Sequence, residues 1–419
     1  MTVGGVDGVD GAAPPEVHEA AERAARQSYG RLVAILSART RDIAASEDAL
    51  ADAFARALER WPAEGIPRQP EAWLLAVARH RVLDAWRHSR VQDEASQTLL
   101  ALADTFAADS GGEAVPDERL RLFFVCAHPA IDAAARAPLM LQTVLGLDAA
   151  RMAGAFLVAP ATLGQRLVRA KARIRAARIP FEFPRARDLP QRLQDVLDGI
   201  YAAYGTGWDD IDGADSAQRG LTGEAIDLCR ILCGLMPREP EPLGLLALML
   251  FCESRAAARR SEDGAYVPLD QQDSRRWDLA MHTQAEQALR HAASLGMAGA
   301  YQLEAAIQSA HCARHLGAEV PAGAVVALYD GLLALRPSTG ARVSRACALA
   351  RAEGPAAGLQ ALDAMAANEV ASYQPFWAAR AHLLSAIGEC DAARAAYARA
   401  MGLATSPAVR AHLASEAER

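Results

Sequence analysis

The stretch GLDAARMAGAFLVAPATLGQRLVRAKARIR, residues Gly146–Arg175, predicts two short helices joined by a tight turn. In the first helix, Met152, Ala153 and Phe156 have the spacing of a buried stripe. Pro160 suits the first turn of the second helix, where its missing N–H group costs little. This pair of helices predicts a helix-turn-helix.

The second helix of this stretch has two chemically distinct faces. Leu163, Leu167, Ala170 and Ile174 recur at spacings of four, three and four residues, which makes one apolar face. At about 100° per residue, polar side chains gather on a different arc of the helix. The members of this polar arc are Thr162, Gln165, Arg166, Arg169 and Arg173. We expect the apolar stripe to be buried and the polar arc to face outward.

The charge of this helix departs from that of the whole chain. From Ala159 to Arg178 there are six basic residues and no acidic one, whereas the chain has a formal net charge of −7. Uncompensated positive charge along one helix is typical of a protein that binds a phosphate backbone. The alternative is an ordinary amphipathic helix with a solvated basic face. Lys171 is the single lysine among 44 basic residues, so a preference for arginine carries little information here.

The composition predicts an all-α chain without a membrane span. Hydrophobic residues make up 52% of the 419 residues but aromatic residues only 5%, and alternating β-branched runs are nearly absent. No apolar run reaches the roughly 18 residues of a membrane-spanning helix, and the first residues lack the segments of a signal peptide. We therefore expect two or three helical domains, in the cytoplasm and with no membrane partner.

The cysteines indicate neither a disulfide framework nor a metal site. There are seven of them, an odd number, and no two form a CxxC pair. Cys126 and His128 lie two residues apart, but no second pair of ligands follows at zinc spacing. The sequence predicts buried free thiols, no metal and no cofactor.

Breaks rich in proline and glycine divide the chain into five segments. Residues 1–16 are expected to be a disordered lead-in, residues 17–90 a first helical domain, and residues 91–116 a linker. Residues 117–180 should form a second helical domain that ends in the helix-turn-helix. Residues 190–419 should form a helical C-terminal region.

The first domain contains two strong helix patterns. Ser46 is expected to be the N-cap of a helix over Ser46–Trp61. The proline-rich stretch Trp61–Pro70 is expected to end this helix. A second helix then covers Glu71–Arg90, with a polar side that is mainly basic.

The C-terminal region predicts a stack of helices. From Gln191 onward, helices of 12 to 18 residues alternate with short turns, and this part carries 27 acidic and 20 basic residues. The unit WAARAHLLSAIGECDAARAAYARA, residues 377–400, matches the tetratricopeptide pattern of helix, turn and helix. The matching positions are Trp377, Ala381, Leu384, Gly388, Ala393, Tyr397 and Ala400. Because such units bury their apolar faces only by stacking, we expect a helical-repeat domain.

Taken in order, these motifs resemble bacterial RNA polymerase sigma factors of the extracytoplasmic-function (ECF) type. SEDALADAFARALERW, residues 46–61, is similar to region 2.2, and AWLLAVARHRVLDAWR, residues 72–87, is similar to regions 2.3–2.4. GLDAARMAGAFLVAPATLGQRLVRAKARI, residues 146–174, is similar to the helix-turn-helix of region 4.2. EPLGLLALMLFCESRAAARR and LDQQDSRRWD resemble the ECF group that carries a long tetratricopeptide-like C-terminal extension.

This resemblance implies a fold and a function. The fold is all-α, with two small helical sigma domains, region 2 and the region 4 helix-turn-helix, followed by a tetratricopeptide-like helical-repeat domain. The function is to bind core RNA polymerase, to recognise the −10 element by region 2 and the −35 element by region 4, and to start transcription. The implied partners are the β′ clamp and β flap of the polymerase, promoter DNA, and a small protein or ligand on the C-terminal domain, which is expected to be regulatory.

The resemblance also assigns roles to residues. It implies that the polymerase binds to Asp48, Asp52, Phe54 and Arg56. It implies that −10 DNA contacts Trp73, Arg79, His80 and Arg87. It implies that −35 DNA contacts the polar arc defined above, with arginine pairing to guanine and glutamine to adenine. His80 stands where ECF proteins usually carry asparagine, and Gly164 lies inside the recognition helix at a cost of about 1 kcal/mol.

Two other classes of function remain open at the level of sequence. The first is a DNA-binding regulator with a helical sensor domain that acts outside the polymerase holoenzyme. The second is an enzyme in the C-terminal half, with candidates at His282, His291, His311, His315, Asp270, Asp273 and Asp278. The histidines have no neighbouring nucleophile or ligand set in the sequence, and the aspartates suit a polar turn paired with arginines. We therefore expect no catalytic residue.

Overall fold

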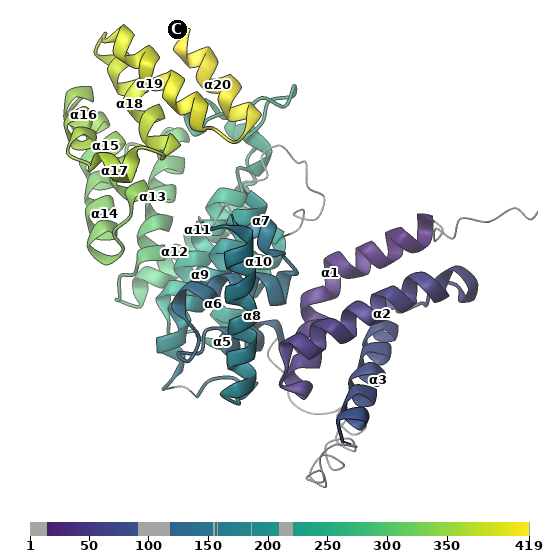
Figure 1. The fold of residues 1–419 in the computed structure, drawn as a ribbon. Coiled ribbons are helices and arrows are strands. Elements are labelled where there is room, and N and C mark those ends of the chain that lie inside the picture. Colours follow the sequence, from purple (N-terminus) through teal and green to yellow (C-terminus); the bar gives the residue numbers. More distant parts are fainter. Residues whose placement is uncertain are drawn as a thin grey trace, which may run out of the picture. The chain divides into compact units, whose positions relative to one another are not determined.

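The computed structural model of this chain describes residues 15–90, 118–153, 156, 158–185, 187–208 and 221–418 (Figure 1). These residues form helices with short connections, and their one extended pairing is an antiparallel bridge between Arg260 and Tyr266. The all-α fold expected from the sequence is confirmed. Most of the expected lead-in (1–16) and all of the expected linker (91–116) lie outside the described residues.

The chain divides into two compact units, Met1–Ala202 and Ala203–Arg419. This division lies inside a helix, some way beyond the start at residue 190 that the sequence suggests for the C-terminal region. Within the described residues, no helix has the length and apolar character that crossing a membrane requires.

Three helices open the first unit: α1 (Pro15–Thr40), α2 (Ile43–Glu64) and α3 (Pro70–Arg90). Each of them packs on the other two. Leu50 and Trp61 of α2 and Leu74 of α3 are almost completely buried, because they lie on the apolar stripes by which these helices meet.

The start of α2 differs from the expected one. The helix begins at Ile43 because the carboxylate of Asp42 accepts a hydrogen bond from Ala45 N at 3.2 Å and so caps it. Ser46 lies inside the helix and is buried, and its hydroxyl donates to the carbonyl oxygen of Asp42 at 2.8 Å. The prediction of Ser46 as the N-cap is wrong.

The end of α2 also lies beyond the expected one. Pro62 stands inside the helix, where it removes a backbone donor without stopping the helix. The helix ends at Gly65, whose φ of 83° leaves the helical path and whose N–H donates to Trp61 O at 3.0 Å. The proline-rich stretch therefore does not end the helix at Trp61.

Four more helices follow in the first unit: α5 (Glu118–Cys126), α6 (Ala133–Leu145), α7 (Ala149–Ala153) and α8 (Pro160–Ala176). α5 and α8 pack on α6, and α7 packs on α8 as the first helix of the expected helix-turn-helix. α1 packs on both α5 and α6. At Gly30 of α1 the contact is so close that any side chain would collide with the backbone of Val144 in α6.

Most of helix α9 (Leu189–Trp208), up to Ala202, belongs to the first unit. Val196 is completely buried. Gly199 has no room for a side chain unless its neighbours shift, because a Cβ atom there would collide with the sulfur of Met140 in α6 and would lie 3.1 Å from the ring of Phe123 in α5. Arg136 of α6 donates to Asp195 of α9 at 2.8 Å. α9 is therefore a structural part of the unit that contains α8.

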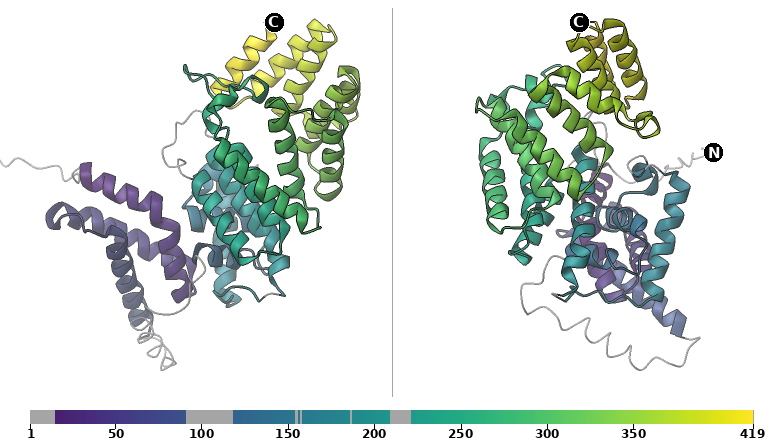
Figure 2. Two further views of the ribbon diagram at one scale, coloured as in Figure 1. Left: turned by 180° about the vertical axis from the view of Figure 1, so that it is seen from behind. Right: turned by 90° about the vertical axis from the view of Figure 1, so that its left-hand side faces the viewer.

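In the second unit, the helices pack mainly on helices that are next to them or two places away in the sequence. The order is α10 (Leu221–Leu235), α11 (Pro240–Glu253), η1 (Ala256–Ala258), η2 (Leu269–Gln271), η3 (Ser274–Arg276), α12 (Leu279–Ser294), α13 (Ala300–His315), α14 (Ala322–Leu335), α15 (Thr339–Glu353), α16 (Pro355–Asp363), α17 (Ala367–Val370), α18 (Gln374–Ala386), α19 (Cys390–Leu403) and α20 (Pro407–Ala417). Figure 2 shows this succession from two further directions. Packing between neighbours is the arrangement of a helical-repeat protein.

The pair α18 and α19 carries the tetratricopeptide-like pattern found in the sequence. Ala381 and Leu384 of α18 are buried, as are Ala393 and Tyr397 of α19. Gly388 lies in the turn between them with a φ of 84°. Small residues thus stand where the two helices meet, as the pattern predicts.

Candidate nucleic-acid interface

Helix α8 has one buried stripe, as its sequence predicts. Leu163, Leu167, Ala170 and Ile174 are each at most 6% exposed. Pro160 takes the first helical position, where its fixed φ suits the helix and no donor is lost. The stripe holds α8 in the unit and decides which of its side chains can reach a partner.

The side chains away from this stripe face the solvent. Thr162, Gln165 and Arg169 are exposed, and Arg166 is half-buried. Arg169 Nε donates to the backbone oxygen of Gln165 at 3.3 Å, which keeps the guanidinium beside that residue. Val168 is 68% exposed on the side opposite the stripe, and the sequence prediction missed it. The sequence does contain a sign of this exposure, because Val168 is an apolar residue that lies outside the spacing of the buried stripe.

Three arginines of α8 line a shallow cavity of about 280 Å³ beside the start of α6. They are Arg166, Arg169 and Arg173, and Arg173 Nε donates to Ala130 O at 3.4 Å. Asp132 also lines the cavity, but its carboxylate accepts a hydrogen bond from the α6 backbone as the N-cap. Among the carboxylates that the structure describes, none forms an ion pair with these arginines.

Two basic residues of α8 have a different role from the one that their charge suggests. Lys171 and Arg175 follow the other flank of the buried stripe and turn toward α2. Lys171 Nζ lies 2.5 Å from Glu47, and both side chains are less than 20% exposed. Arg175 lies 3.3 Å from Asp42. The basic segment is thus split between an open arc and a contact with α2, which a charge count cannot show.

The two ring side chains expected to meet −10 DNA differ in their surroundings on α3. Trp73 is half-buried and packs edge-on against Trp61, with ring centroids 5.6 Å apart. His80 is exposed, and its Nδ1 lies 2.7 Å from a carbonyl oxygen of the preceding turn. Trp73 therefore contributes to the packing between α2 and α3, while part of its ring is exposed to solvent.

The two arginines expected to meet −10 DNA are not equally placed. Arg79 is half-buried near Arg39 of α1, and burial first, then the charge of Arg39, lowers the pKa of its guanidinium. Its Nε is buried without a hydrogen-bond partner among the described residues. The side chain of Arg87 lies outside the described residues.

The four residues expected to bind polymerase do not share one side of α2. Asp48, Asp52 and Arg56 follow one another at four-residue spacing, so they lie along one edge of the helix. Asp52 pairs with Arg81 of α3 at 2.5 Å. Phe54 is half-buried and lies on another side.

Cys126 and His128 each form a hydrogen-bond contact within the protein. Cys126 is buried, its sulfur lies 3.7 Å from the hydroxyl of Thr143, and burial raises the pKa of its thiol to about 12. His128 Nδ1 accepts a hydrogen bond from Ala130 N. The described residues contain no cluster of ligands suited to a metal ion.

Comparison with known proteins gives matches in both units. Residues 25–91, which cover most of α1 and all of α2 and α3, match the family model for sigma-70 region 2. Residues 192–293 match a family of unknown function (DUF6596). α8 lies outside both matches. No solved structure matches the chain.

Two relatives show how far the similarity extends. An uncharacterized protein of Rhizobium meliloti (strain 1021) is 37% identical over 382 residues, which cover 89% of this chain and 89% of that protein. A protein of Xanthomonas campestris pv. campestris named Probable RNA polymerase sigma factor RfaY is 32% identical over 173 residues. That match covers 38% of this chain and 42% of RfaY.

Proposed function

Because the chain belongs to the ECF sigma factors that carry a helical C-terminal extension, we propose that it binds core RNA polymerase and directs it to promoters. Helices α1–α3 serve as region 2 at the −10 element, and α5–α8 serve as region 4 at the −35 element. The observation that carries this assignment is α8, which has one fully buried stripe and, away from it, a compact set of side chains suited to DNA.

The first three turns of α8 enter the major groove. Gln165 pairs with adenine and Arg169 with guanine, because each offers two hydrogen-bonding atoms in one plane. Thr162 contacts a base or a phosphate near the start of the helix. Val168 adds an apolar contact with a thymine methyl group, which explains an exposed valine at this position.

Arg166 and Arg173 bind the phosphate backbone beside the same groove. They line the cavity at the start of α6 and have no described carboxylate as a partner, so their charges are available to phosphates. Phosphate contacts fix the position of the helix, and base contacts supply the sequence preference.

Region 2 opens and holds the −10 strand through α3. The open part of the Trp73 ring stacks an unpaired base, and His80 contacts the strand from the exposed side of the helix. Arg79 and Arg87 supply positive charge for phosphates. Because Trp73 also packs on Trp61, its replacement affects folding as well as DNA binding.

The polymerase contacts lie on α2. The edge formed by Asp48, Asp52 and Arg56 binds the β′ clamp, with Phe54 as an apolar contact at its side, and region 4 meets the β flap. Catalysis belongs to the polymerase, and we assign no chemical step to this chain. These partners place the protein in the cytoplasm, and its helical extension acts as a regulatory or partner-binding module.

Replacing arginines of α8 tests the proposal. Arg166→Ala and Arg169→Ala should each weaken promoter binding by about 1–3 kcal/mol, measured by fluorescence anisotropy with holoenzyme and DNA from upstream of the protein's own gene. Arg175→Ala is the matched control, because it removes the same charge from the other flank of α8 and should have little effect. Equal affinities for all three variants would contradict the assignment.

Run-off transcription separates this proposal from a regulator outside the holoenzyme. A sigma factor must co-purify with core polymerase and give a defined transcript. A regulator of the other class would bind the same DNA without the polymerase, and Asp48→Arg on α2 would leave its binding unchanged.

A further inference from the structure

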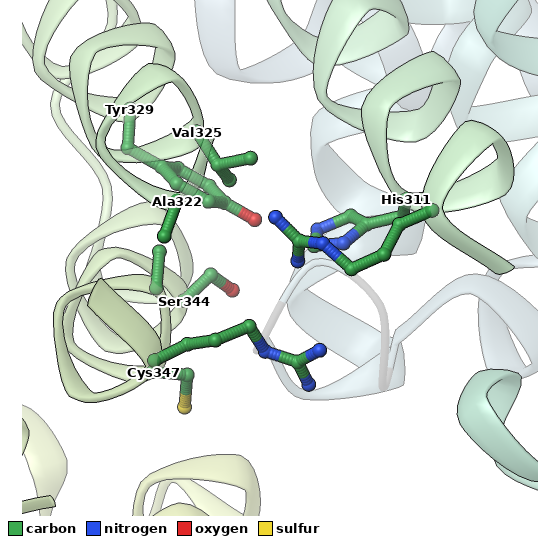
Figure 3. Close-up of a pocket in the computed structure, with 9 residues that line it drawn as sticks. His311, Ala322, Val325, Tyr329, Ser344 and Cys347 are labelled. Atoms are coloured by element: carbon green, nitrogen blue, oxygen red, sulfur yellow. The ribbon is translucent and has the colours of Figure 1, made fainter. Parts of the chain in front are cut away.

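The second unit contains a cavity of about 210 Å³ among α13, α14 and α15 (Figure 3). His311 and Arg314 reach it from α13, Tyr329 from α14, and Ser344 and Arg351 from α15. An adjoining cavity of about 490 Å³ shares His311, Arg314 and Arg351 and extends to His315 and to the exposed Asp270. The proposed sigma-factor activity uses none of these residues.

The cavity concentrates positive charge in an acidic part of the chain. Residues 191–419 carry 27 acidic and 20 basic side chains, yet Arg314 and Arg351 meet at one site. They lie close enough for the charge of Arg351 to lower the pKa of the Arg314 guanidinium, in addition to the effect of burial. Like charges near each other raise the free energy of an empty site, and a bound anion would relieve it.

Two other arginines of α15, outside the cavity, form ion pairs with carboxylates. On α15, Arg342 pairs with Glu369 at 2.6 Å and Arg345 pairs with Asp330 at 2.5 Å. Among the carboxylates that the structure describes, none forms an ion pair with Arg314 or Arg351.

Neutral hydrogen-bonding groups complete the cavity. In Figure 3 the side chains of Tyr329, Ser344 and His311 converge on the same space from three helices. Tyr329 and Ser344 hydrogen-bond to each other through their side chains. Val325 supplies an apolar wall. Hydroxyl donors beside two guanidinium groups are the surroundings that proteins use to bind oxyanions.

We propose that this cavity binds a small molecule through a doubly charged oxyanion, either a phosphate monoester or a pair of carboxylates. The anionic group lies between Arg314 and Arg351, and the Tyr329 hydroxyl donates to it while accepting a hydrogen bond from Ser344. The rest of the molecule occupies the adjoining cavity, where Asp270 disfavours a second anionic group. The combined space is of the size that small-ligand sites have in other proteins.

Calorimetric titration of the full-length protein tests the proposal. Glycerol 3-phosphate, inorganic phosphate and succinate are the probes, and acetate at matched ionic strength is the singly charged reference. At least one doubly charged probe should bind tenfold or more tightly than acetate. The order of affinity among glycerol 3-phosphate, inorganic phosphate and succinate then shows whether the site prefers a phosphate or a pair of carboxylates. If no probe binds more tightly than acetate, the proposal is overturned.

Two variants locate the binding. Arg314→Gln and Arg351→Gln should each weaken binding of the best probe by about 10- to 100-fold, since a hydrogen-bonded charge is lost. Arg394→Gln is the matched control, because Arg394 is exposed on α19 and pairs with Asp391 of its own helix. If the two cavity variants bind as the control does, the anion is held elsewhere and the proposal is overturned.

The pKa of His311 gives a second test of anion binding, in the protein without substitutions. Burial first, then the charges of Arg314, Arg351 and Arg255, lowers the pKa of its ring to about 4. The titratable groups around it are Arg314, His315, Tyr329, Cys347, Arg351, Arg255 and Asp270. A bound anion should raise this pKa, so at pH 5 inorganic sulfate, which remains doubly charged there, should move the ring NMR signals toward the protonated form. The signals are assigned with His311→Gln, and unchanged signals at saturation contradict the proposal.

Discussion

Gly164 lies inside α8, where a residue without a side chain lowers helix stability. The nearest atom that a Cβ would meet is the Cβ of Ala149, at 4.0 Å, so an alanine fits at this position. Gly164→Ala should therefore raise the free energy of unfolding by about 0.5–1 kcal/mol, measured by urea denaturation.

Gly146 provides the opposite case for comparison. Its φ of 68° is left-handed, and the ring of Tyr29 lies 3.0 Å from where a Cβ would stand, so Gly146→Ala should destabilise the unit.

Promoter affinity should be unchanged in Gly164→Ala. A loss of affinity there would mean that DNA approaches the backbone of α8 more closely than proposed.

For a single residue, the sequence predicts the side of the helix on which its side chain lies, but not which residues of other helices face it. The spacing places Arg169 and Arg173 correctly on one arc of α8. It cannot show that Arg79 faces Arg39, or that Trp73 packs on Trp61, because those neighbours come from other helices. For the same reason the sequence flags His311 without indicating the arginines around it.

Helix α9 decides where the first unit can be cut. Val196, Leu197 and Ile200 are completely buried, and Gly199 fits against Phe123 and Met140 of the first unit. A chain ending at residue 190 loses these contacts, whereas one ending at residue 208 keeps them. The shorter chain should be less stable by at least about 4 kcal/mol, since each large apolar side chain contributes about 1.5–3 kcal/mol.

Urea denaturation of the two truncated chains measures this difference, with far-UV circular dichroism as the signal. Equal midpoints would mean that α9 is dispensable to the first unit. The result also matters for tests of the extension, because a cut at residue 190 would alter region 4 as well as removing the second unit.

Helix positions are predictable here, but helix ends are less so. Apolar spacing fixes the buried stripe of α8, because burial follows the period of the helix. The cap of α2 depends on which oxygen reaches the free N–H groups. Asp42 reaches Ala45, so Ser46 is left inside the helix, although both residue types are good caps.

On the scale of the whole molecule, composition and periodicity predict an all-α chain, and neighbour-to-neighbour packing in the second unit agrees with a repeat pattern. The division into units is harder to predict, since α9 is one helix that belongs partly to each of them. Proline and glycine mark where a helix stops, not which unit it packs against.

The proposed function sets a requirement on the contact between α2 and α8. The −10 and −35 elements lie about 25 base pairs apart, which is about 85 Å along DNA at 3.4 Å per base pair. The longest helix of region 2, α1, has 26 residues and therefore spans about 39 Å. Regions 2 and 4 cannot occupy both elements while Lys171 stays paired with Glu47, so the pair must separate on the promoter.

Because Lys171 is the single lysine of this sequence, chemical modification of its amine can show whether its ion pair with Glu47 is formed. An amine-reactive reagent can modify only Lys171 and the amino terminus, and in the free protein the Lys171 side chain is 13% exposed and held by Glu47. Acylation of Lys171, followed by mass spectrometry, should become faster when holoenzyme binds promoter DNA. Lys171→Arg gives the background from the amino terminus, and an unchanged rate would mean that the two regions stay together. One amine thereby records whether this protein is open or closed.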